Sequence, residues 1–581
     1  MGNQWCSTAE VQSKSVHKRQ FPLSVLKVSD FLQMQGRLDC HQVLKGQGLL
    51  HEWQIGMFVI FISHQWLGNR HPDPTGQRAD VLRAGLKGLI DGSLQVVPPI
   101  IGMIYGQAPK LAPQTAKQIE EGYIFMDWFA IPQLHIASDD SFSELKSQQE
   151  MAIQSIPGYV EASSLFIAFA PEMQHVDRGV VCNYTSWLSR GWCRLELWCR
   201  LLSNKSDTTV IVLHSATEAE FMFQLDWQHN NIADGEFTVE DDRAVVVKLG
   251  EMAAAGKIQH LWYAGPLHDY RFYLANKTNL MGEAPRSFDA EEFLEEFRFG
   301  TLEDAVKDKT PMTSILCAIL AGDVKMLRLL TESRADINAR TQGLGHLGYY
   351  DSMTPLMIAT RSNQNMSMLS TLLELKADLD ARTSTGVNVA FLARSPDSVD
   401  LLVKARGDFE TGALPVGLTA LCGAAGLASA ETMAAMLTAR CDVNPKNLGI
   451  GWSPLHATAL FSRGNRDAKR KAQMLIEHRA DINRPASMTG PFRLICTMAR
   501  VEASIRGLSS CSSGTRFFAS NSGITPLGMA ALVGDRVLAD LFLKMGAYDI
   551  PNQRGDLPEE IASANQHRHV LSSLAMISAS Y

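Results

Sequence analysis

The segment 192–197, which reads WCRLEL, contains the residues of this chain whose types and spacing best suit catalysis. If the segment is helical, Trp192, Glu196 and Cys199 lie on one stripe at positions i, i+4 and i+7. A carboxylate beside tryptophan is partly desolvated, which raises its pKa and makes Glu196 a candidate catalytic residue. The structural alternative is a helical ion pair, because Glu196 precedes Arg200 by four residues in the favourable order.

Other chemistries have weaker support in the sequence. It contains no G-x-x-x-x-G-K-[ST] phosphate loop, no H-E-x-x-H, no G-x-S-x-G and no G-x-G-x-x-G after a predicted strand. The spacing of His175, Cys182, Cys193 and Cys199 does not match known zinc sites. We therefore predict no metal site, and we expect Cys193 and Cys199 to pack as small core residues.

Four short apolar runs separated by helical patterns must position Glu196. Continuous apolar runs are typical of strands buried on both faces of a parallel sheet. Alternation of such strands with helices predicts an α/β domain with a doubly wound parallel sheet over residues 51–215. The predicted strands are residues 57–62, 123–126, 165–169 and 209–213, and the predicted helices lie near 80–90, 141–155 and 189–202.

Polar and aromatic residues follow the first two predicted strands. Ligands of doubly wound folds bind outside the carboxyl ends of the strands. Aromatic and hydrogen-bonding groups there suit a nucleotide base and ribose, and they equally suit a sheet end plugged by side chains. The residues placed at these ends are Ser63, His64, Trp66, Asp127 and Trp128.

Residues 51–215 also resemble the TIR (Toll/interleukin-1 receptor) domain family. Residues 61–64 (FISH) look like the first-strand motif, and residues 192–197 look like the late Trp-Cys-x-x-Glu-Leu motif. Residues 125–133 look more like the related heterokaryon-incompatibility domains of fungi. The resemblance implies that Glu196 cleaves NAD. With NAD as the substrate, the candidate NAD-binding residues are Ser63, His64, Trp66, Asp127, Trp128 and Trp192.

The implied reaction breaks the bond between nicotinamide and ribose. Such cleavage passes through an oxocarbenium-like state that a carboxylate stabilises. Nicotinamide leaves without a general acid, so Glu196 alone would carry the chemistry. NAD would be the substrate, and no cofactor is predicted. The resemblance equally implies an inactive module that only self-associates.

The C-terminal half is dominated by repeats from about residue 310. Each unit opens near Thr-Pro-Leu, as at 354–356 and 525–527, and closes with an Ala-Asp-hydrophobic-Asn turn, as at 480–483. The pattern resembles the ankyrin repeat, which implies an all-α solenoid. Threonine caps the first helix, proline suits its first turn, and a glycine is expected at the left-handed turn after the second helix.

We predict about six ankyrin repeats and a C-terminal cap over residues 309–581, with a partner protein on the concave face. Closing aspartates lie at 336, 378, 408, 442 and 481, so several repeats carry insertions. The Ser- and Gly-rich segment 484–521 is predicted to be a loop. Residues 216–308 are predicted to form a helical extension and connector.

Composition narrows the classes of function. A formal net charge of −7 over 581 residues argues against binding nucleic acid through bulk charge. The ten cysteines include no C-x-x-C pair, and no signal peptide or membrane-length apolar run is present. These features predict reduced thiols and a cytoplasmic location.

The N-terminus reads MGNQWCS over residues 1–7. Gly2 is what N-myristoylation requires, although Cys6 replaces the usual Ser or Thr and is itself a candidate palmitoylation site. A basic cluster follows at residues 14–19. One myristoyl chain binds membranes only marginally, so stable attachment needs a second acyl chain or a basic patch. The sequence therefore predicts a leader over residues 1–50 that attaches the protein to the cytoplasmic face of a membrane; an unmodified disordered terminus is the alternative.

Two functions follow from these features. One is an intracellular signalling scaffold that binds partner proteins through ankyrin repeats and assembles through a TIR-like domain. The alternative is an NAD glycohydrolase that acts through Glu196.

Overall fold

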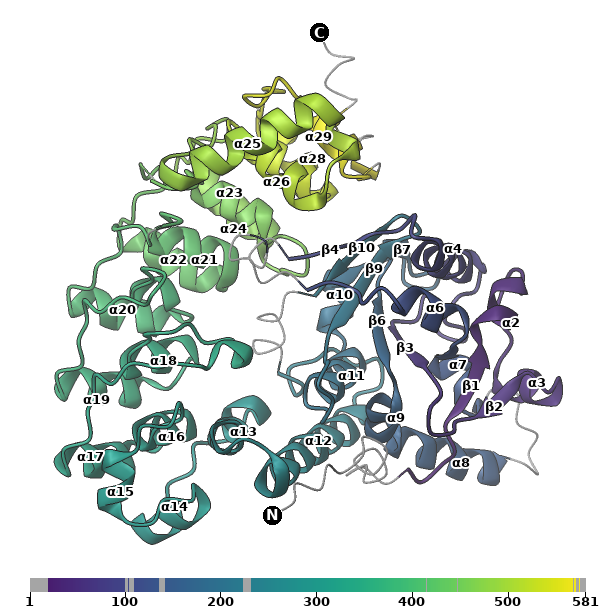
Figure 1. The fold of residues 1–581 in the computed structure, drawn as a ribbon, viewed down its shortest axis with the longest axis horizontal. Helices are drawn as coiled ribbons and strands as arrows, with labels where there is room; N and C mark the ends of the chain where they lie inside the picture. Colours follow the sequence, from purple (N-terminus) through teal and green to yellow (C-terminus); the bar gives the residue numbers. More distant parts are fainter. Residues whose placement is uncertain are drawn as a thin grey trace, which may run out of the picture. The chain divides into compact units, whose positions relative to one another are not determined.

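The computed structural model describes residues 19–99, 103, 109–134, 142–222, 231–413, 415–446, 448–567, 569, 570 and 574. The predicted lipidation sites Gly2 and Cys6 lie outside these residues. The chain divides into two compact units, Met1–Gly265 and Pro266–Tyr581 (Figure 1). The division lies within the segment predicted to be a connector.

The first unit is an α/β domain built on a mixed sheet. Among the described residues the sheet has eight strands in the order β2-β1-β5-β3-β6-β9-β10-β4. Their bounds are β1 Ser24–Lys27, β2 Leu50–Glu52, β3 Val59–His64, β4 Val96–Val97, β5 Tyr123–Phe125, β6 Leu165–Phe169, β9 Val210–Ser215 and β10 Glu218–Phe221.

The centre of the sheet consists of the predicted parallel strands. β3 pairs in parallel with β5 and β6, and β6 pairs in parallel with β9. In chain order these four strands are arranged 2-1-3-4, which places a topological switch point between β3 and β6. All residues of β3 and β6 are buried, and Phe61 stacks on Phe125 and Phe166 with ring centroids 4.7 and 5.3 Å apart.

The sheet is mixed, which differs from the predicted parallel sheet. β1 and β2 form an antiparallel edge, and β10 runs antiparallel to β9. β1 begins at Ser24, so part of the predicted leader belongs to the sheet, and β10 extends the domain beyond residue 215. These strands were missed because they are short, and short edge strands carry little apolar signal.

Helices cover both faces of the parallel strands. Right-handed crossovers require the helices between β3 and β5 to lie on one face, and those between β5 and β9 to lie on the other. Figure 1 shows α4 (Gln77–Asp91) and α6 (Thr115–Glu120) beside one face, and α9 (Ile156–Ala162) and α11 (Gly191–Leu201) beside the other. α12 (Asp242–Ala264) packs on α11.

The first unit also contains further helices and a two-stranded sheet formed by β7 and β8. They are α2 (Val28–Gln33), α3 (His41–Gly46), α7 (Asp127–Ala130), α8 (Phe142–Gln154), α10 (Tyr184–Ser189), β7 (Met173–Gln174) and β8 (Val181–Cys182). In neither unit does a described helix combine the length and apolar character needed to cross a membrane.

The second unit is mostly helical. It begins with α13 (Leu267–Met281), α14 (Ala290–Glu296) and α15 (Leu302–Lys307). Pairs of short helices follow: α16 (Ser314–Ala321) and α17 (Val324–Glu332), α18 (Pro355–Arg361) and α19 (Met366–Glu374), η4 (Ala390–Leu392) and α20 (Pro396–Lys404), α21 (Ala420–Leu427) and α22 (Ala430–Thr438), α23 (Pro454–Leu460) and α24 (Ala468–Glu477), and α27 (Pro526–Val533) and α28 (Arg536–Lys544). α29 (Pro558–Ala564) follows the last of these pairs.

The Thr-Pro motifs start first helices as the sequence predicts. Thr354 accepts a hydrogen bond from the amide of Met357, and Thr525 accepts one from the amide of Gly528. First helices contact one another in chain order, including α16 with α18, α21 with α23, α23 with α27 and α27 with α29. The second helices contact one another in the same way, for example α20 with α22 and α22 with α24.

The closing turns form a ladder of hydrogen bonds between neighbouring pairs. The side-chain oxygen of Asn444 accepts a hydrogen bond from the amide of Asp481 at 2.8 Å, and Asn338 accepts one from Asp378 at the same distance. Asn483 accepts from the amide of Tyr548, also at 2.8 Å. This last bond skips the segment 484–521, so the ladder continues across the insertion.

The expected glycine at the left-handed turn is replaced by a basic residue after most of the helix pairs. These residues have φ values between 63° and 73° although they carry a Cβ atom, a conformation that glycine adopts more easily. They are Arg334, Lys376, Arg406, Arg440 and Arg479. Only the last pair has a glycine there, Gly546 with φ 93°. The prediction was therefore wrong for five of these turns.

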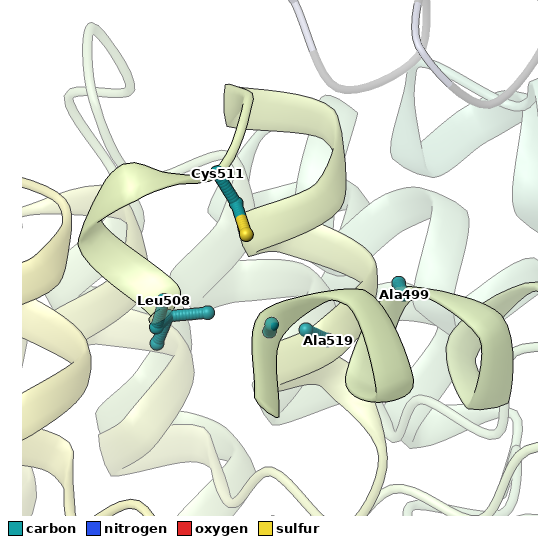
Figure 2. Close-up of a cluster of buried hydrophobic side chains, with 5 residues drawn as sticks. Ala499, Leu508, Cys511 and Ala519 are labelled. Atoms are coloured by element: carbon teal, nitrogen blue, oxygen red, sulfur yellow. The ribbon is translucent and has the colours of Figure 1, made fainter. Parts of the chain in front are cut away.

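The segment 484–521 is not the predicted loop. It forms α25 (Gly490–Arg506), η5 (Leu508–Ser510) and α26 (Ser513–Asn521). Phe492, Cys496, Ala499 and Ala503 recur at helical spacing and are buried. Figure 2 shows this core, in which Ala499 and Ala503 of α25 pack with Leu508, Cys511 and Ala519. Serine and glycine content obscured an apolar periodicity that was present in the sequence.

Candidate functional site

Glu196 lies on α11, on the side that faces β3. The Ser63 hydroxyl at the end of β3 donates a hydrogen bond to the Glu196 carboxylate at 2.5 Å. Ser63 in turn accepts a hydrogen bond from the indole of Trp187 at 3.1 Å. The first residue of α11, Gly191, lies so close to the ring of Phe237 that a Cβ atom at this position would overlap the ring. The carboxylate is therefore fixed at the carboxyl end of a central strand.

The surroundings of Glu196 favour its neutral form. Burial raises the pKa of Glu196 to about 8; the hydrogen bond from Ser63 opposes this shift, and the negative charge of Asp127 adds to it. At neutral pH the residue therefore holds a proton in most molecules. A carboxyl group in this state donates a proton or a hydrogen bond more readily than an ordinary glutamate.

A second carboxylate, Asp127, lies at the end of the neighbouring strand. It begins α7 directly after β5, and it accepts hydrogen bonds from His64 Nε2 at 2.7 Å and from Trp66 Nε1 at 2.9 Å. Burial raises the pKa of Asp127, but the charge of His64 and the hydrogen bonds from His64 and Trp66 outweigh it, so the pKa is lowered overall. Asp127 is therefore ionised at neutral pH.

The two carboxyl groups have opposite pKa shifts within one cluster. Such a divergence is a common arrangement in acid–base sites, where one group holds a proton and the other a charge. His64 Nδ1 is buried and has no hydrogen-bond partner among the described residues. These features make the carboxyl end of β3 and β5 the best candidate for a chemical site in the first unit.

The structure gathers most, but not all, of the residues that the sequence selected. Ser63 meets Glu196, while His64 and Trp66 meet Asp127. Trp192 instead donates a hydrogen bond to Asp242 of α12 at 3.0 Å.

Trp128 contributes to the interior of the domain. Its side chain is buried, and its indole donates to the carbonyl oxygen of Leu38 at 3.0 Å. The ring meets Trp66 edge-on, with centroids 5.5 Å apart. The buried Trp128 ring therefore packs against the Trp66 ring and helps to hold it in position.

Within the described residues, Glu196 and Arg200 do not form the ion pair that the sequence offered as the alternative. Arg200 is buried and donates hydrogen bonds to the carbonyl oxygens of Ser163, Ser164 and Thr209, each at 3.4 Å. Glu196 and Arg200 thus interact with different parts of the sheet. The favourable i, i+4 order was present in the sequence, but tertiary partners determined both contacts.

Two residues of the site were missed in the sequence. Trp187 supports Ser63, as described above. Arg78 of α4 is buried, and its guanidinium donates to the carbonyl oxygens of Gln65 and Phe169, which joins the ends of β3 and β6 at the switch point. Burial lowers the pKa of Arg78 to about 10. No motif or spacing marked either residue, because their partners are distant in the chain.

The second unit presents a different candidate surface on α25. Leu494, Met498, Val501 and Ile505 follow one another at intervals of four, three and four residues, and they are between 56 and 79% exposed. The opposite face of the helix packs on the core seen in Figure 2. Exposed apolar side chains grouped in this way mark interaction surfaces. We call these four residues the α25 stripe.

Comparison with known proteins identifies part of the second unit. Residues 351–384 match the family model described as Ankyrin repeat. This range contains α18 and α19 and reaches the closing turn at Asp378. The comparison with curated proteins gives no match. The chain therefore contains an ankyrin repeat at residues 351–384.

Proposed function

We propose that this protein is a scaffold that binds a partner protein through its second unit. Ankyrin repeats generally bind protein partners. The helix pairs on both sides of residues 351–384 repeat the same caps and closing turns, which supports a continuous ankyrin solenoid. Solenoids present extended surfaces to partners.

The α25 stripe is the observation that carries this proposal. Its spacing of four, three and four residues is that of a helix seam that packs against another helix. Arg493 and Arg506 lie exposed on the same helix, where Glu502 is the only acidic residue. Two copies of such a helix would bring like charges together. We therefore assign to the stripe an acidic amphipathic helix of a different protein.

A designed peptide tests this assignment. The probe is a labelled helical peptide with a leucine seam flanked by glutamates, and its matched control has lysines in place of the glutamates. Fluorescence anisotropy with the full chain should show tighter binding of the acidic peptide. Leu494→Ser with Ile505→Ser should reduce this binding at least tenfold. Val403→Ser, at an exposed apolar position on α20, should leave it unchanged.

Three outcomes would overturn the assignment. Equal binding of both peptides would remove the role of charge. Self-association in sedimentation experiments that Leu494→Ser abolishes would identify a second copy as the occupant. Loss of the apolar stripe without any effect on peptide binding would place the docking surface elsewhere, for example on the concave face of the repeats.

A second candidate function, hydrolysis of NAD, is supported by the cluster around Glu196. A desolvated carboxyl group beside Ser63, with ionised Asp127 on the neighbouring strand, suits stabilisation of an oxocarbenium-like state. Water would add to the ribose carbon, nicotinamide would leave, and ADP-ribose and a proton would be released. The reacting form requires ionised Glu196, which the cationic nicotinamide ring would favour. In this function the α/β domain would self-associate to complete the site.

Release of nicotinamide from NAD by the purified full chain tests this function. Turnover should rise with pH towards about 8, where the Glu196 carboxyl ionises. Glu196→Gln should lower turnover by about 100-fold, the scale of losing one preorganised electrostatic group. Glu144→Gln, an exposed residue of α8, is the matched control. No release at any protein concentration, or activity that survives Glu196→Gln, would leave the scaffold as the function.

We also propose, from the sequence alone, that Gly2 carries a myristoyl group and Cys6 a palmitoyl group. Two acyl chains would hold the scaffold stably on the cytoplasmic face of a membrane. The repeats would then bring their partner to that surface.

A further inference from the structure

Three side chains of types that can bind a metal ion, His268, Asp269 and His346, meet in the second unit. His268 and Asp269 lie in the first turn of α13, and His346 lies in η3 (Gly345–Leu347). His346 Nε2 is 2.7 Å from Asp269 Oδ1, and His268 Nε2 is 3.4 Å from the same oxygen. One ligand atom from each residue lies within 4.8 Å of the other two.

Solvent reaches all three side chains. His268, Asp269 and His346 are 29, 17 and 50% exposed, so an ion could enter without unfolding the site. The two imidazole rings stand edge to face with centroids 5.8 Å apart. Rings in this arrangement converge on one carboxylate from two directions.

The elements that carry the ligands are held together by other contacts. The segment with η3 is closed by a hydrogen bond from the Thr341 amide to the Met353 carbonyl at 3.0 Å. Tyr349, just after η3, meets Phe272 of α13 edge-on with centroids 5.7 Å apart. The site is therefore formed by packing as well as by its polar contacts, and it would persist without an ion.

We propose that His268, Asp269 and His346 bind one zinc ion. Two imidazoles and a carboxylate are ligands that zinc prefers, and their distances allow Zn–N and Zn–O bonds of about 2.0–2.2 Å after small side-chain rotations. The ion would replace the hydrogen bond between His346 and Asp269, so neutral imidazoles and an ionised carboxylate would coordinate it. Water would fill the fourth position. This site was not predicted, because His346 is far from the other two ligands in the sequence.

The consequence of binding is local. Zinc would tie the first turn of α13 to the segment 339–353 between the first two helix pairs of the second unit. A ligand that binds only the folded protein stabilises it by mass action. The ion therefore has a structural role that does not depend on the partner protein or on NAD.

Calorimetry on the full chain tests the proposal. Protein treated with a chelator and with a thiol reductant is titrated with zinc chloride, and variants are compared by the number of equivalents bound. His346→Ala and Asp269→Asn should each abolish the binding of one equivalent of zinc or lower its affinity at least about 100-fold. Loss of even a residue that only contacts a metal ligand lowers metal affinity by about 10–100-fold. Circular dichroism of each variant checks that the substitution leaves the fold intact.

Two controls separate this site from other zinc-binding groups. His478→Ala removes an exposed histidine on a different part of the second unit and should change nothing. Cobalt bound at the site should show weak d–d bands without thiolate charge transfer, because all ligands are nitrogen or oxygen. The proposal is overturned if the variants bind as many equivalents with the same affinity as the unaltered protein. It is equally overturned if cobalt gives only thiolate bands that the variants leave unchanged.

Discussion

Ser63 and Glu196, separated by 133 positions in the chain, share a hydrogen bond of 2.5 Å. The bond joins the carboxyl end of the central strand β3 to the middle of α11. It holds a carboxyl group where burial favours the proton, and it places that group next to the strand end that carries Asp127. Burying an ionisable group that is charged in the unfolded chain costs stability at neutral pH, and such groups are often found at functional sites.

The first prediction concerns stability and pH. Folding raises the pKa of Glu196 from 4.5 to about 8, so the folded protein binds more protons at this residue between these values. The contribution of Glu196 to the free energy of unfolding therefore falls as pH rises through this window. Glu196→Gln, which cannot ionise, should gain in melting temperature relative to the unaltered protein as pH rises from 5 to 8.5.

Thermal melts of both proteins across this pH range measure the effect. Glu144→Gln, at an exposed position, should follow the unaltered protein at every pH. A difference between Glu196→Gln and the unaltered protein that is constant with pH would mean that Glu196 is ionised throughout.

The second prediction compares buried and exposed leucines of the second unit. Leu527 follows the Thr-Pro motif of α27 and is fully buried, whereas Leu494 belongs to the α25 stripe. Leu527→Ala should lower the free energy of unfolding by about 2–5 kcal/mol, because it leaves a cavity. Leu494→Ala should change it by less than about 0.5 kcal/mol. Denaturant unfolding followed by circular dichroism measures both, and equal effects would contradict the burial of α27.

The third prediction concerns a strained turn. Arg440 has φ 64° at an exposed position before a closing turn. Arg440→Gly should raise the free energy of unfolding by about 1 kcal/mol, since glycine has no Cβ atom to oppose a left-handed conformation. Arg440→Ala keeps the Cβ atom and removes the same charge, so it should bring no gain. If both variants behave alike in urea, the turn is not strained.

The fourth prediction concerns the acylated N-terminus. Gly2→Ala should move the protein from the membrane fraction to the soluble fraction, and Cys6→Ser should do so partly, because one chain alone binds marginally. Fractionation and mass spectrometry of the N-terminal peptide measure the two effects. An unmodified Gly2 in a protein that is already fully soluble would disprove acylation.

Local sequence was enough to predict several elements. Continuous apolar runs located β3, β5, β6 and β9, because a strand buried on both faces must be apolar throughout. Thr-Pro motifs located the starts of α18 and α27, because capping and proline geometry depend on neighbouring residues alone. The position of Ser63, His64 and Asp127 at strand ends followed from the same runs.

Tertiary structure decided the features that depend on distant partners. The sequence placed Trp192 beside Glu196 on one helical stripe, yet Trp192 bonds to α12 and Glu196 to β3, because each lies against a different neighbour. Arg200 had a suitable partner in the sequence and bonds to backbone carbonyls instead. Sequence spacing defines which residues share a helix face, but only packing defines what that face meets.

Dependence on distant partners also explains why the sequence did not reveal the α25 stripe or the cluster of His268, Asp269 and His346. The periodicity of α25 was readable in the sequence, but which of its apolar faces is buried depends on α26 and η5. His346 joins His268 and Asp269 only after the helix pairs of the second unit have packed. Composition and local pattern therefore determined the α/β character of the first unit and the mostly helical character of the second. The contacts of the candidate sites arose from long-range packing, which brings together side chains that no local rule connects.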